Sequence, residues 1–132
     1  MFIKLYGIAF TVFLAIDAVW LVLIAKNFYA KHIGYLMAKN PNLWAAFIFY
    51  LIFIAGLVFF VITPALDKKM WIYAFLAGLF FGLVTYATYD LTNLATVKDW
   101  PLIVTIIDIT WGMCVSAAVS VVTYFITLKL GL

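Results

Sequence analysis

The 132-residue sequence contains no arginine and no glutamate, and charged residues make up only 10% of it. Its eight basic residues are all lysine, and its five acidic residues are all aspartate. Without arginine the chain lacks the planar bidentate clamp that proteins commonly use on phosphate, which argues against phosphoryl chemistry. The net charge of +3 is spread over the predicted loops and helix ends, so we expect no nucleic-acid partner.

Cysteine and histidine, which bind many transition metals, are each present once. Cys114 can form no internal disulfide and stands in an apolar run, so we expect a small core residue. The sequence has no glycine-rich phosphate loop and no nucleophile–base motif. We therefore expect no cofactor and no metal site, and the sequence assigns no catalytic residue.

Apolar residues dominate what is present: 70% of the chain is hydrophobic, and the mean hydropathy is +1.25. Soluble domains average about 45–50% apolar residues, so we predict an integral membrane protein in contact with the lipid bilayer. Residues 1–132 are predicted to form a single all-α domain, a four-transmembrane-helix bundle. The expected spans are 5–24, 43–66, 71–96 and 100–128, and the last two turns, 67–69 and 97–99, are tight.

The linker between the first two spans, residues 26–39, has a different character. Its apolar residues recur at roughly helical spacing with lysines between them, which predicts a short amphipathic helix in the membrane interface. Asp17 interrupts the first apolar stretch, so we interpret that stretch as a span and not as a signal peptide. Four lysines fall on each side of the predicted bundle, which indicates no orientation. This balance permits an antiparallel homodimer, and the favoured alternative is a weak bias toward a single orientation.

Two motifs, Ile16–Trp20 and Ile107–Trp111, each place an aspartate inside a span and a tryptophan three residues later. A carboxyl group in hydrocarbon is costly and marks a functional site by default. Four spans put both chain ends on one side, so Asp17 and Asp108 are both expected roughly 11 Å below the opposite surface, at about 1.5 Å per residue. If the first and last helices are neighbours, the two carboxyls can meet, and one of them would keep its proton.

The third span adds further polar side chains at the same depth. Gly78 and Gly82 permit close helix packing, as does Gly112 on the fourth span. The second span has no ionisable side chain except Tyr50 and is interpreted as scaffold. We predict a proton- or solute-binding cavity formed by Asp17, Trp20, Thr85, Tyr86, Tyr89, Asp90, Asn93, Asp108 and Trp111.

Structural interpretations stand beside this prediction. Asp17 and Asp108 could be acids that lock the bundle through hydrogen bonds to tyrosine, threonine or backbone groups. Asp90 lies closer to the membrane surface, where a solvated or helix-end role is the alternative. An all-oxygen site for a hard cation, built from the three aspartates and Asn93, is a further alternative.

The chain resembles the bacterial predicted-membrane-protein family known as domain of unknown function 2177. The resemblance rests on Asp17-x-x-Trp20, Phe28-Tyr29, the run Gly82–Thr96, Trp100-Pro101 and Asp108-x-x-Trp111-Gly112. It covers nearly the whole chain and implies a multi-pass protein of the bacterial inner membrane with about four helices. It also implies that the gene lies beside genes of fatty-acid-modifying enzymes, and hence a lipid-linked role.

Two classes of function follow. In the first, the cavity binds a small solute and couples its transport to protons or ions. In the second, the protein is an enzyme or accessory protein of fatty-acid or lipid modification, whose aspartates act as general acid and base beside a lipid ligand. The absence of catalytic motifs favours the first class.

Overall fold

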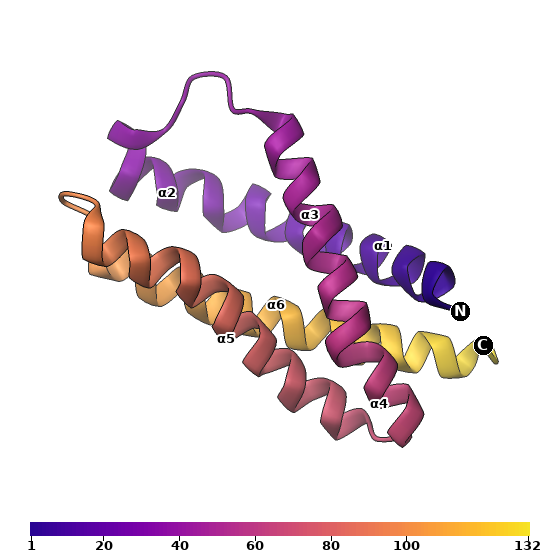
Figure 1. Ribbon diagram of the computed structural model, residues 1–132. Helices are drawn as coiled ribbons and strands as arrows, with labels where there is room; N and C mark the ends of the chain where they lie inside the picture. Colours follow the sequence, from indigo (N-terminus) through magenta and orange to yellow (C-terminus); the bar gives the residue numbers. More distant parts are fainter.

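The computed structural model describes residues 1–132 as helices joined by short turns, without a strand. Four helical segments are long and apolar enough to cross a membrane, which confirms the predicted all-α architecture. Both chain ends lie at the same end of the molecule (Figure 1). The helices are α1 (Phe2–Trp20), α2 (Lys26–Ile33), α3 (Leu43–Leu57), α4 (Thr63–Lys68), α5 (Trp71–Thr96) and α6 (Leu102–Lys129).

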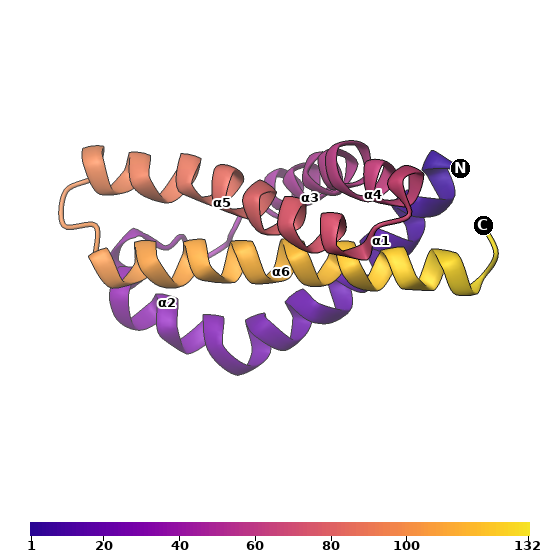
Figure 2. The same ribbon diagram turned by 90° about the horizontal axis from the view of Figure 1, so that it is seen from below.

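The short helix expected between the first two spans is present as α2, and it follows the first span without a break. A π-helical turn, Leu21–Ala25, joins α1 to α2, and helical structure runs without a break from Phe2 to Leu36. The turn contains no glycine or proline that would stop the helix. Figure 2 shows that this first span bows away from α6 near its middle. The bow carries α2 back toward the start of α6.

The second span is continuous in a similar way. Asn42 caps α3 by accepting a hydrogen bond from the Ala45 N–H at 3.1 Å. A second π-helical turn, Val58–Ile62, precedes Pro64. Proline has no backbone N–H and cannot donate a hydrogen bond to the preceding turn, but the helix continues as α4. The tight turn into α5 places Lys69 in the left-handed conformation, with φ of 55°.

The apolar core lies in the half of the bundle that contains the chain ends. α5 and α6 run antiparallel side by side, α1 packs on α6, and α3 crosses them obliquely (Figures 1 and 2). The prediction that Cys114 is a core residue is wrong, since its side chain is exposed on α6. The main buried cluster comprises Leu5, Ala9, Phe13, Phe53, Ile54, Leu57, Val58, Val61, Ile62, Val115 and Val119.

Candidate functional site

A cavity of about 460 Å³ occupies the other half of the bundle, away from the chain ends. Every span contributes to it: the second half of the first span, the first half of α3, the later turns of α5 and the first turns of α6. Asn93, nearer the end of α5, does not line it. The other expected cavity residues do, namely Asp17, Trp20, Thr85, Tyr86, Tyr89, Asp90, Asp108 and Trp111.

The carboxyl group of Asp17 is held by a tyrosine from another span. The Tyr50 hydroxyl, on α3, donates to Asp17 Oδ2 at 3.0 Å, and only 7% of Asp17 is exposed. The interpretation of the second span as scaffold missed this contact. Tyr50 is the only side chain of α3 that carries a hydroxyl, amide or charge. A lone polar side chain inside an apolar span is a signal that could have indicated Tyr50 as a partner of one of the aspartates.

Asp108 has an equivalent partner. The Tyr29 hydroxyl donates to Asp108 Oδ1, although the two residues are 79 positions apart. Tyr29 lies on α2, so this bond depends on the first span continuing past its π-helical turn. The expectation of a helix in the membrane interface gave no reason to place Tyr29 beside Asp108, yet Tyr29 lines the cavity. Asp17 and Asp108 line one cavity, and each carboxyl accepts a hydrogen bond from its own tyrosine.

The two motif tryptophans meet directly. The indole rings of Trp20 and Trp111 stack with centroids 4.4 Å apart and planes 6° from parallel. Both rings also line an apolar hollow of about 280 Å³. The tryptophan pair is therefore part of the wall of both the aspartate cavity and this hollow, which is otherwise lined by Ile16, Val19, Leu23 and Ile24.

Asp90 differs from the other two aspartates because nothing in the chain pairs with it. Its side chain is fully buried, and neither carboxyl oxygen has a hydrogen-bond partner. This burial contradicts the alternative of a solvated role near the membrane surface. No three aspartate, histidine or cysteine side chains are close enough together to hold a metal ion. The cavity thus combines two tyrosine-bound carboxyls with one that has no partner.

Glycines bring α5 and α6 together behind the cavity. A Cβ atom on Gly78 would lie 2.9 Å from Ala117 Cα, and one on Gly82 would lie 2.7 Å from Met113 Cα. On α6, a Cβ atom on Gly112 would lie 2.7 Å from a ring carbon of Tyr86. These glycines therefore pack within the chain, and any second copy must contact another face.

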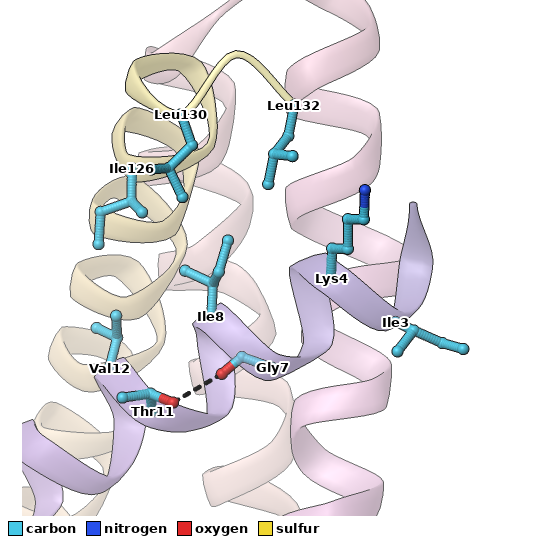
Figure 3. Close-up of a pocket in the computed structure, with 9 residues that line it drawn as sticks. All are labelled: Ile3, Lys4, Gly7, Ile8, Thr11, Val12, Ile126, Leu130 and Leu132. Carbon is cyan, nitrogen blue, oxygen red and sulfur yellow. Dashed lines mark hydrogen bonds between the residues drawn. The ribbon is translucent and has the colours of Figure 1, made fainter.

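A shallower groove of about 570 Å³ lies at the opposite end, between the start of α1 and the end of α6 (Figure 3). Its lining is mostly apolar, and Lys4 is its one charged side chain. The Thr11 hydroxyl in its wall already donates to the Gly7 carbonyl at 2.8 Å. This groove lacks the converging polar groups that orient a solute, so the aspartate cavity is the better candidate.

The family described as "Predicted membrane protein (DUF2177)" has a model that matches residues 2–125. The chain belongs to this family. The matched region contains every residue that lines the aspartate cavity. No curated protein and no solved structure shows significant similarity to the chain. Family membership and the four apolar helices together identify a multi-pass membrane protein.

Proposed function

We propose that this membrane protein binds a small solute in the aspartate cavity and couples the binding to proton transfer, as a transporter does. The observation that carries the proposal is Asp90, a fully buried carboxyl without a partner in a cavity that Asp17 and Asp108 also line. A purely structural carboxyl inside a membrane would be expected to find a donor, because leaving it unpaired is costly. The cavity volume also lies within the range of about 300–1,000 Å³ typical of ligand sites.

The tyrosine partners suit a group that exchanges protons. A phenol hydroxyl can donate to a carboxylate and equally to the carbonyl oxygen of a protonated acid. Tyr50 and Tyr29 can therefore keep Asp17 and Asp108 in place in either protonation state. We propose that these two aspartates carry the exchanged proton, and that the protein works in the bacterial inner membrane.

Proteoliposomes with a pH-sensitive dye inside test this proposal. A panel of polar and cationic solutes is added outside, and internal pH is followed for wild type, Asp17→Asn and Asp99→Asn. Asp99 lies in the exposed turn between α5 and α6, so its variant makes the same chemical change outside the cavity. We expect solute-dependent proton movement in wild type and Asp99→Asn only. A folded Asp17→Asn protein with unchanged proton movement would contradict the proposal.

One observation supports the lipid-linked alternative as a second candidate. The hollow beside Trp20 and Trp111 is lined by apolar side chains alone, and it shares these two residues with the aspartate cavity. We propose that, in this case, an acyl chain lies in the hollow while its polar end reaches the aspartates.

Mass spectrometry of lipid retained by the purified protein tests the second candidate. We expect stoichiometric lipid in wild type and its loss in Val19→Trp, which fills the hollow. Val22→Trp is the control, because Val22 is 74% exposed and does not line the hollow. Wild-type protein without stoichiometric lipid would count against this candidate.

A further inference from the structure

We propose that the ligand of the aspartate cavity is an organic cation, whose ammonium group pairs with Asp90 among aromatic side chains. This inference rests on the proposed solute-binding function and names the ligand class of that site.

A positive charge or a proton from outside the chain would stabilise the unpaired carboxyl group of Asp90. Its two oxygens have no hydrogen-bond partner, and no lysine or histidine lines the cavity. Of the hydroxyls that line the cavity, those of Tyr29 and Tyr50 already donate to Asp108 and Asp17, and those of Thr85, Tyr86 and Tyr89 make no hydrogen bond with Asp90. An ammonium group supplies both the charge and the N–H or polarised C–H contacts that this carboxyl lacks.

The rest of the lining selects for an organic cation. Aromatic rings attract cations through their negative faces, and tryptophan does so most strongly. The cavity is lined by seven aromatic side chains: Trp20, Tyr29, Phe49, Tyr50, Tyr86, Tyr89 and Trp111. A hard metal ion would instead need several oxygen ligands around one point, and the aspartates do not converge in that way. Three carboxyl groups in one cavity would repel an anion.

A matched pair of probes tests the charge requirement on the wild-type protein. Benzyltrimethylammonium and neopentylbenzene have nearly the same shape, since carbon replaces the charged nitrogen in the second compound. Binding to protein in lipid nanodiscs is followed by tryptophan fluorescence, with empty nanodiscs as the blank. We expect the cation to bind at least about tenfold more tightly than the neutral probe. Equal affinities would overturn the proposal.

A matched pair of variants then places the site. We expect Asp90→Asn to weaken benzyltrimethylammonium binding at least about tenfold and Asp99→Asn to leave it unchanged. Unchanged affinity in a folded Asp90→Asn protein would overturn the assignment to Asp90. If that variant does not fold, the wild-type comparison of the two probes still decides whether the site requires a cation.

Two further measurements are made. The first distinguishes a lipid headgroup from a free amine as the source of the cation, and the second tests the cation site and the proposed proton coupling separately. Phosphatidylglycerol nanodiscs that contain the same minor fraction of either uncharged diacylglycerol or phosphatidylethanolamine are compared, so that both sets carry the same lipid charge. Weaker probe binding in the second set would identify a lipid headgroup as the occupant, and equal binding a free amine; both outcomes support a cation site. Cation binding without proton movement in proteoliposomes would contradict the proposed coupling to protons and leave the cation site intact. Proton-coupled uptake of neutral solutes, without uptake of cations, would contradict the cation site and leave the proposed coupling intact.

Discussion

The indole rings of Trp20 and Trp111 stack in parallel, 4.4 Å apart, and join the two copies of the aspartate–tryptophan motif. The two copies of the motif, one on α1 and one on α6, thus line the same cavity. Each copy places its aspartate beside the cavity and its tryptophan in the wall. The stacked pair is a direct contact between the antiparallel helices α1 and α6, three residues after each aspartate.

The stacking predicts an energetic coupling between the two tryptophans. In a double-mutant cycle of Trp20→Ala and Trp111→Ala, the coupling should be about 0.5–1.5 kcal/mol, the range for aromatic pairs beyond their buried area. The free energy of unfolding is measured by detergent titration in mixed micelles. If the two single effects simply add, the rings do not stabilise each other.

The close approach of α5 to α6 predicts that Gly82→Ala destabilises the bundle by about 1–3 kcal/mol, as overpacking does. The new methyl group would meet the backbone of Gly112 and Met113, which cannot rotate away. Gly7→Ala is the control, because no atom lies within 4 Å of its added Cβ. That variant should be neutral or slightly stabilising, by up to about 1 kcal/mol. Equal effects of both changes on unfolding would contradict the packing.

The tyrosine–aspartate bonds predict two separable spectral effects. Tyr50→Phe should shift the infrared band assigned to the Asp17 side chain, and Tyr29→Phe should shift that of Asp108, since each removes one donor. Each variant should lose about 0.6 kcal/mol of stability, the average for hydrogen bonds between membrane helices. Tyr35→Phe is the control, because its hydroxyl donates to the Asp99 carbonyl in a turn outside the cavity. Shifts of both aspartate bands in either variant would contradict separate pairs.

The aspartates and tryptophans of the site could be predicted because a carboxyl inside an apolar span stands out from sequence alone. Helical spacing and the even number of spans then placed Asp17 and Asp108 at the same depth. The glycines of α5 stood out in the same way, as small residues one turn apart, and the structure shows that their partner is α6 of the same chain.

The partners of the aspartates could not be predicted in that way. Tyr29 reaches Asp108 only because a π-helical turn bends the first span without ending it, and local sequence does not report such a turn. Tyr50 reaches Asp17 because α3 crosses the bundle obliquely, a tertiary property. The burial of Asp90 likewise depends on how its neighbours pack, whereas its position near the end of a span suggested solvent.

Infrared titration of the carboxyl groups in lipid shows whether an aspartate of the cavity exchanges a proton. Wild type is compared with Asp17→Asn, Asp90→Asn and Asp108→Asn for assignment, and with Asp99→Asn as the control. We expect a protonated-carboxyl band that titrates within the pH range in which the protein stays folded, and that is lost or altered in the cavity variants. If no carboxyl of the cavity titrates anywhere in that range, the aspartates do not exchange protons and have a structural role.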